Sequence, residues 1–281
     1  MKSKIFLASL MCVCGLALFA QTPPVEFPAP SPACTLKQRV GVTDIEVVYS
    51  RPGVKDRVIF GGMIPYGEVW RTGANNATKI TFSTAVKLNG TEIPAGTYAL
   101  FTIPGEKEWT IIMNKGAAQW GAFQYDEKLD VARFKATPVP LTTPMETFVI
   151  EFTDIRDESA RLNLAWDKTL VPIKFEVELT GKLVPQIEAV MASDATNKPY
   201  YQAAMFYYDH GQDLKKASVW VDAAIKQREA HYIVYLKAKI HAKLGDKEGA
   251  IAAANRSIEL AKTAKDTGYI KLNEDLIDSL K

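Results

Sequence analysis

The chain has 281 residues, of which 47% are hydrophobic, and a formal net charge of +2. This length accommodates one large domain or two ordinary ones, each with its own core. A charge this close to balance, with no polybasic run, argues against nucleic acid and anionic membrane surfaces as partners.

The first twenty residues have the three-part layout of a secretory signal peptide. Lys2 and Lys4 form a basic start, an apolar run covers 5–19, and Ala20 precedes a polar, Pro-rich stretch. The apolar run is short for a membrane span. We therefore predict a signal peptide over 1–20 that exports the protein to the periplasm or the extracellular space.

Cysteine usage fits an exported chain that folds without disulfides. Its three cysteines are Cys12, Cys14 and Cys34. A lipoprotein modified at Cys14 is the weaker alternative, because Val13 is larger than the residue that normally precedes a modified cysteine. Removing the signal leaves Cys34 alone, so no intrachain disulfide can form. We expect Cys34 to be a small apolar residue near the start of the first strand, with a free nucleophile or a pairing between chains as alternatives.

A Pro-rich linker over 21–32 precedes a predicted β domain over 33–180. Prolines at 23, 24, 28, 30 and 32 exclude a helix and a regular ladder from this linker. Asn89-Gly90 supplies the two positive φ angles of a type I′ hairpin turn. About nine short strands at this spacing predict an antiparallel, jelly-roll-like β-sandwich. The expected strands are 36–40, 44–50, 78–86, 97–103, 108–114, 131–139, 146–153, 160–166 and 171–179.

After Gly181 the hydrophobic period becomes helical, which predicts a second domain over 183–281 and thus an α+β chain of two domains. Gly211 and Gly245 are 34 residues apart, which is the tetratricopeptide period. The aromatic-Leu-Gly signature is missing, so we predict two divergent tetratricopeptide-like hairpins over 199–262 and a capping helix. Such a module needs the β domain or a protein partner to pack on. The expected helices are 184–191, 199–210, 214–228, 231–244, 247–262 and 269–280, with breaks at Gly211, Gly245 and Gly268. Small residues at Ala204, Ala217, Ala224, Ala238, Ala250, Ala254 and Ser257 should allow close helix packing.

Four strings in the β domain resemble the bacterial family of domain of unknown function DUF2911. They are Tyr49-Ser50-Arg51-Pro52, Ile64-Pro65-Tyr66-Gly67, Val69 to Asn75 (VWRTGAN) and Pro94 to Tyr98 (PAGTY). The similarity spans roughly 31–178. The resemblance implies a secreted β domain and carries no activity.

The best candidate ligand-binding residues lie in the loop before the third predicted strand: Tyr66, Trp70, Arg71, Asn75 and Asn76. Arg71 offers a planar fork for a carboxylate or phosphate, Trp70 or Tyr66 a stacking surface, and Asn75 both a donor and an acceptor. The ligand would be a small polar molecule or a carbohydrate. The competing interpretation, which we favour, makes Trp70 a core residue and Arg71 an internal tie to loop carbonyls or Glu68.

Residues for catalysis or metal binding do not form a recognisable group. His210, His231 and His241 all lie in the helical part, so the β domain has no histidine for a metal site or a catalytic triad. We expect these histidines at the surface or between helices. We predict no catalytic residue, no metal ligand and no cofactor.

Aromatic residues outside the loop offer a second way to bind carbohydrate. Trp109, Trp120, Trp166, Phe123 and Tyr125 could form a platform, although most tryptophans of an apolar sandwich belong to its core. An exposed coplanar pair would favour the platform.

Taken together, the residues favour a non-catalytic exported protein of the cell envelope, a binding or scaffold protein with a helical module for protein contact. The alternative is a hydrolase that acts on a glycan or another polar envelope component. It would use carboxylates near the 61–76 and 120–130 loops, and the candidates are Glu68, Asp126, Glu127 and Asp130.

Overall fold

The computed structural model describes residues 26–281. The predicted signal peptide over 1–20, Cys14 and the first part of the linker lie outside the described residues. Residues 26–32 form neither helix nor strand, as expected of a Pro-rich linker. Ten strands and then six α-helices follow, so the described chain is α+β, as predicted.

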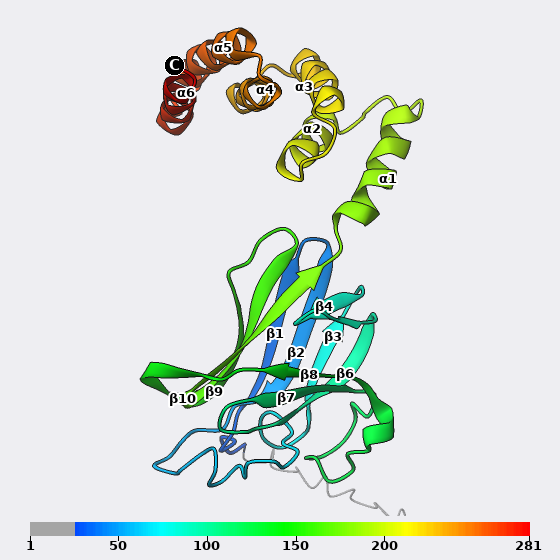
Figure 1. The fold of residues 1–281 in the computed structure, drawn as a ribbon, viewed down its shortest axis with the longest axis vertical. Helices are drawn as coiled ribbons and strands as arrows, with labels where there is room; N and C mark the ends of the chain where they lie inside the picture. The colour runs from blue at the N-terminus through cyan, green and yellow to red at the C-terminus, as the bar shows by residue number, and fades with distance from the viewer. Residues whose placement is uncertain (1–25) are drawn as a thin grey trace, which may run out of the picture.

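The strands form two antiparallel sheets (Figure 1). One sheet has six strands in the order β1-β2-β3-β6-β7-β8, and the other has four in the order β5-β4-β10-β9. A short 3-10 helix, η1 (Glu127–Leu129), lies just before β8. The strands are β1 (Ala33–Val40), β2 (Thr43–Ser50), β3 (Thr78–Phe82), β4 (Val86–Leu88), β5 (Thr91–Ile93), β6 (Gly96–Ile103), β7 (Trp109–Asn114), β8 (Asp130–Ala136), β9 (Val139–Thr153) and β10 (Ser159–Val177).

Local sequence rules explain several of these strands. Alternation along β2 buries Ile45, Val47 and Tyr49 on one face, because successive side chains of a strand point to opposite sides. The Asn89-Gly90 turn joins β4 to β5 with φ angles of 46° and 82°, the signs that a type I′ turn requires. The predicted hairpin is therefore confirmed.

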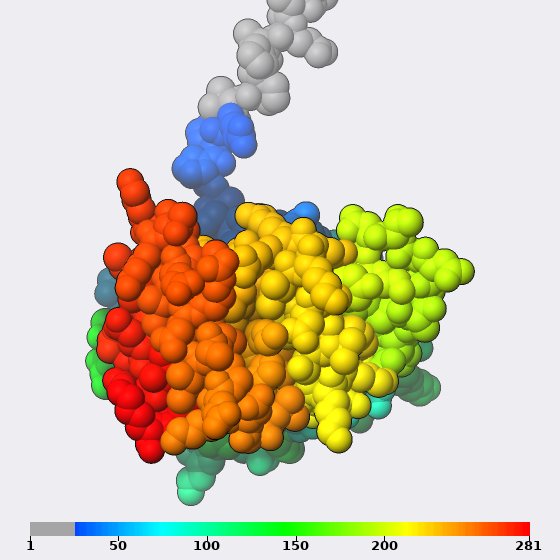
Figure 2. All heavy atoms as spheres, turned by 90° about the horizontal axis from the view of Figure 1, so that it is seen from above, coloured from blue at the N-terminus to red at the C-terminus, as the bar shows by residue number. Residues whose placement is uncertain are grey.

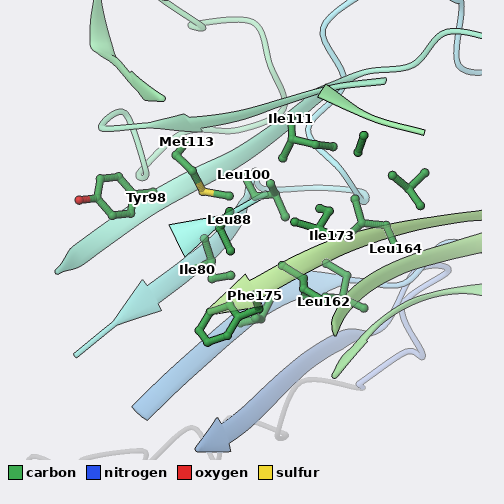
Figure 3. Close-up of a cluster of buried hydrophobic side chains, with 14 of the residues drawn as sticks. Ile80, Leu88, Tyr98, Leu100, Ile111, Met113, Leu162, Leu164, Ile173 and Phe175 are labelled. Carbon is green, nitrogen blue, oxygen red and sulfur yellow. The ribbon is translucent and has the colours of Figure 1, made fainter. Parts of the chain in front are cut away.

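The two sheets enclose one hydrophobic core. Figure 3 shows side chains of β3, β6 and β7 from the six-stranded sheet pointing toward side chains of β4 and β10 from the other sheet. Ile80, Leu100 and Ile173 are fully buried there. Cys34 lies in β1, half-buried against this core, as predicted of a small apolar residue. The jelly-roll-like description stays a prediction.

Several predicted strands have different bounds in the structure. The strand expected over 78–86 ends at Phe82, and Val86 begins a strand of the other sheet. The strands expected over 160–166 and 171–179 form the single strand β10. Its register against β9 shifts around Asp167, which has a φ of 51°, so the chain bulges there and does not turn.

The helices follow the predicted order. Asp213, Asp246 and Asp266 accept hydrogen bonds from backbone N–H groups in the first turn of α3, α5 and α6, and so begin these helices. None of the described helices combines the length and apolarity needed to span a bilayer. The helices are α1 (Thr180–Ala192), α2 (Tyr200–Asp209), α3 (Leu214–Gln227), α4 (His231–Leu244), α5 (Lys247–Ala264) and α6 (Thr267–Ser279).

Small side chains let these helices approach closely. All seven small residues expected at helix contacts are buried. Gly211 and Gly245 adopt φ angles of 64° and 84° between helices, as predicted of helix breaks. The break predicted at Gly268 is wrong, because α6 begins at Thr267 and the chain turns at Lys265, which has a φ of 57°. The tetratricopeptide-like description stays a prediction.

The helical part joins the β domain where β10 ends. Figure 1 shows α1 leaving the sheet, and Figure 2 shows α1 to α6 as a layer in chain order. One Glu158 oxygen accepts hydrogen bonds from the backbone of Leu179 and Thr180, and the other lies 3.7 Å from His210 at the end of α2. Burial opposes ionisation of Glu158, but the Thr180 bonds and the charge of His210 outweigh it, so the pKa of Glu158 lies below its ordinary value.

Candidate functional site

Two long loops of the β domain are joined to each other by their backbones. The first runs from Arg51 to Ala77 and the second from Lys115 to Leu129. Ala77 N donates to Gln119 O and Gly121 N donates to Asn75 O, both at 3.0 Å. All five predicted ligand residues lie in the first loop, so the second loop decides what surrounds them.

Trp70 is the residue that fixes the first loop. Its side chain is 5% exposed and its backbone exchanges two hydrogen bonds with Thr102 of β6. Its ring stacks on Trp166 of β10, with centroids 5.8 Å apart, and meets the edges of Trp109 and Phe148. Trp70 thus packs between side chains of both sheets, in agreement with the favoured interpretation as a core residue, and offers no open stacking surface.

Arg71 and Asn75 hold the loop in shape. Arg71 Nη1 donates to the carbonyl of Asn75 at 3.3 Å, and that carbonyl also accepts from Gly121. The Asn75 side-chain amide reaches Ser31 O and Ser50 Oγ, each at 3.3 Å. The guanidinium is half-buried and forms no ion pair with Glu68 or any other carboxylate of residues 26–281. Arg71 therefore ties the loop to a carbonyl, as one form of the favoured interpretation requires, and keeps most of its donors unused.

Asn76 and Trp120 form an exposed pair across the two loops. They occupy an isolated antiparallel bridge, flanked by the hydrogen bonds of Ala77 and Gly121 described above. In such a pair the two side chains project from the same face with their Cβ atoms about 5 Å apart. Trp120 is 59% exposed, and Asn76 is also exposed. An amide and an indole face are thus offered to solvent side by side.

Phe123 and Arg71 converge beside this pair. A Cβ atom placed on Gly121 would lie 2.8 Å from the Phe123 ring and 3.0 Å from Arg71 Nη1. The edge of the Phe123 ring and the Arg71 guanidinium are therefore neighbours on the two sides of Gly121. Phe123 is 84% exposed. Gly121 suits this position because its φ of 68° lies in the left-handed region and a Cβ atom would crowd the Phe123 ring.

Tyr66 is exposed at some remove from these contacts along the first loop. Its ring packs on Gly61, where a Cβ atom would lie 2.6 Å from Cε2 of the ring. The structure thus leaves Tyr66 and Asn76 accessible among the five predicted residues, while Trp70 is buried and Arg71 and Asn75 are half-buried.

Three of the four carboxylates proposed for a hydrolase hold the second loop in shape. Asp126 caps η1 by accepting from the backbone of Lys128. Asp130 accepts from Asn114 Nδ2 and from the Tyr125 hydroxyl, both at 2.7 Å, and Glu127 pairs with Arg133. Burial and the Asp130 carboxylate both raise the pKa of Tyr125. Glu68 is exposed on the other loop. No observation favours a pair of these groups acting on a substrate.

Other candidate chemistry is sparse in residues 26–281. His231 lies 3.3 Å from Asp266 and His241 lies 2.7 Å from Asp246, so these histidines tie helix ends, as expected of packing residues. No group of three or more histidine, cysteine, aspartate or glutamate side chains in this part of the chain could hold a metal ion.

From the sequence, Trp120 and Phe123 were predicted only as members of the possible aromatic platform. Trp109 and Trp166 of that set belong to the core, as the core interpretation predicted, and Tyr125 bonds to Asp130. A local signal did exist, because Trp120 is flanked by Gln119 and Gly121 and is not part of an alternating run. No local signal, however, could have paired Trp120 with Asn76.

Comparison with known proteins gives one match. A family model described as "Protein of unknown function (DUF2911)" matches residues 31–175, which cover both loops and all of the strands except the last two residues of β10. No curated protein and no solved structure matches the chain. Since the matched residues make up more than half of the chain, the protein belongs to the DUF2911 family.

Proposed function

We propose that this chain is an exported, non-catalytic binding protein whose β domain takes up a carbohydrate or another polar ligand on the two joined loops. The exposed pair of Trp120 and Asn76 carries the proposal. A flat indole face packs against the C–H face of a sugar ring, and an adjacent amide donates to and accepts from its hydroxyl groups. Arg71 and Phe123 would border the ligand.

The rigidity of the loops supports binding over a structural role for this surface. Trp70 and the backbone hydrogen bonds of Ala77 and Gly121 fix both loops. Binding a ligand would therefore cost little conformational entropy in these loops. A tryptophan on the surface of a fixed loop contributes nothing to the core. Trp120 shares the second loop with Phe123, which is 84% exposed, and a cluster of exposed aromatic side chains is typical of a binding surface.

Export and domain architecture belong to the same proposal. The basic start and apolar run of 1–20 support a signal peptide cleaved after Ala20, and the common core of the two sheets supports a jelly-roll-like sandwich over 33–180. Equivalent breaks at Gly211 and Gly245, with buried alanines between the helices, support tetratricopeptide-like hairpins that contact a protein partner. Mass spectrometry of the protein from the periplasmic or culture fraction tests export, and we expect Gln21 as the first residue.

Binding to a printed array of neutral and acidic glycans tests the ligand proposal. We expect the mature protein to bind a subset of the glycans and Trp120→Ala to weaken that binding at least tenfold, on the order of 2 kcal/mol, as for a central aromatic contact. Val58→Ala is the matched control, because Val58 is 72% exposed on the first loop and outside the pair. Equal binding by the two variants would refute the assigned surface, and no glycan binding at all would refute carbohydrate as the ligand.

A further inference from the structure

The helical part carries a second surface that neither the family match nor the loops explain. We call it the tyrosine face and define it by Tyr201, Tyr208, Tyr235, Lys239, Lys243 and Tyr269. These residues come from α2, α4 and α6. Figure 1 shows these three helices on the side of the helical layer nearer the β domain, with α3 and α5 on the far side. The inference rests on the protein-contact role proposed above for the helices.

Helical spacing brings the basic and aromatic groups of the tyrosine face together. Tyr235, Lys239 and Lys243 are four residues apart along α4 and so share one side of it. The ammonium groups of Lys239 and Lys243 lie 4.5 and 4.7 Å from the centre of the Tyr208 ring of α2. The Tyr235 ring meets the Tyr269 ring of α6 at 5.6 Å. The face is therefore continuous across three helices.

Most polar groups of the tyrosine face lack a hydrogen-bond partner within residues 26–281, and the exception is Lys243, whose Nζ donates to the Tyr208 carbonyl at 3.2 Å. Within residues 26–281, none of its four hydroxyl groups forms a hydrogen bond, and neither Lys239 nor Lys243 pairs with a carboxylate. Neighbouring lysines behave differently, because Lys237 pairs with Asp222 and Lys271 pairs with Asp275. Burial raises the pKa of each of these tyrosines, so the hydroxyl groups stay neutral donors.

Tyrosines of this kind are typical of protein interfaces. A half-buried ring presents a large, rigid contact area with a polar tip, and few rotamers are lost when a partner covers it. Asp209, Asp266 and Asp275 lie near these tyrosines, and Asp266 and Asp275 already pair with His231 and Lys271. Lys239 and Lys243 keep their charges for a partner, and an interface matches positive groups with negative ones. We propose that the tyrosine face docks an acidic segment of a partner protein, whose carboxylates pair with Lys239 and Lys243 while its apolar side chains pack on the rings.

Fluorescence anisotropy with two labelled peptide sets tests this proposal on the mature protein. The acidic set consists of twelve-residue peptides that combine Glu with Leu and Pro, and the basic set has Lys at every Glu position. We expect the acidic set to bind and the basic set not to bind. The double variant Lys239→Glu/Lys243→Glu should weaken acidic binding by roughly tenfold or more, because each charge pair becomes a repulsion.

A matched variant separates this effect from a change in net charge. Lys107→Glu/Lys262→Glu alters two exposed lysines of the β6–β7 turn and of α5 by the same amount, and it should bind as the parent does. Tyr235→Phe, which removes a hydroxyl and keeps the ring, provides a second variant that preserves packing and should weaken binding severalfold. Thermal melts of each variant confirm that the helices remain folded.

The outcomes distinguish the face from the wider protein-contact role. Binding of the basic set, or acidic binding that survives Lys239→Glu/Lys243→Glu, overturns the acidic docking site and leaves protein contact elsewhere on the helices intact. Self-association that the double variant abolishes would show a second copy of this chain as the occupant, and it also overturns the proposal. Absence of binding by either set overturns the proposal together with its basis.

Discussion

Trp70 and Trp120 lie on two loops that are hydrogen-bonded to each other, yet their surroundings are opposite. Trp70 is 5% exposed and packs between side chains of both sheets, whereas Trp120 is 59% exposed and lies opposite the exposed Asn76 in an isolated bridge. The first residue therefore contributes stability and the second is free to contribute binding. At this end of the β domain, the first loop thus supplies the buried tryptophan that stabilises the fold, and the second loop supplies the exposed tryptophan of the proposed binding surface.

Truncating Trp70 should have the largest effect on stability. Trp70→Ala removes a buried ring that contacts Phe60, Trp109, Phe148 and Trp166, and it leaves a cavity between the sheets. We expect a loss of about 3 to 5 kcal/mol in the free energy of unfolding. Urea denaturation of the mature protein measures it. A loss as small as that of Trp120→Ala would remove the distinction between the two loops.

Removing the Tyr125 hydroxyl should have the next largest effect, in the second loop. Tyr125→Phe leaves the Asp130 carboxylate, which is 7% exposed, without one of its donors. The expected loss is about 2 kcal/mol, the range for hydrogen bonds to charged groups. Guanidinium denaturation at neutral pH measures this loss in the free energy of unfolding. Asp126→Asn is the control, because it changes the same loop and leaves this hydrogen bond intact.

Alkaline pH should show the same contact in the parent protein. The pKa of Tyr125 is raised by folding from the ordinary value of 10.0, so its contribution is complete below that pH and is lost as the pH rises above it. We expect the parent to lose more stability than Tyr125→Phe as the pH rises above about 10. Parallel curves for the two proteins would show that the hydroxyl is not held as described.

Replacing Arg71 should cost less stability than replacing Trp70 and more than replacing Trp120. A fully buried tie would be worth about 3 kcal/mol, but the half-buried guanidinium donates one long hydrogen bond of 3.3 Å. Arg71→Ala should therefore cost about 1 kcal/mol. Differential scanning calorimetry decides, with Arg71→Lys to separate the charge from the planar donor group. A loss near 3 kcal/mol would make Arg71 mainly structural and weaken its place beside the ligand.

Trp120→Ala should have the smallest effect on stability. Its exposed ring has no packing contact with another aromatic ring in residues 26–281, so we expect a change within about 0.5 kcal/mol. Urea denaturation beside Val58→Ala checks this value. A loss above about 1.5 kcal/mol would assign Trp120 to the structure of the loop and remove the main support for binding.

Local sequence rules predicted those parts of the fold that depend on neighbouring residues. The type I′ turn at Asn89-Gly90 and the starts of the helices at Leu214 and Lys247 depend on only a few adjacent residues. The change of sheet after Phe82 and the bulge at Asp167 depend instead on which distant strand becomes the partner. The alternation of apolar and polar residues along a strand does not identify its partner strand.

The candidate site was predicted in part for the same reason. The motif around Trp70 identified the loop, but Trp70 is buried because its ring packs on Trp109 of β7 and Trp166 of β10. Asn76 came from the sequence, whereas its neighbour Trp120 is more than forty residues away and was grouped with tryptophans of the core. Burial of a given tryptophan is a property of the assembled fold and cannot be read from its neighbours.

Iodide quenching of tryptophan fluorescence tests the central distinction most directly. The protein has five tryptophans, and Trp70, Trp109, Trp166 and Trp220 are each at most 9% exposed. We predict that the native protein has one quenchable component, which disappears in Trp120→Phe and persists in Trp109→Phe. Quenching that remains unchanged in Trp120→Phe would contradict the account, because another tryptophan would then face solvent.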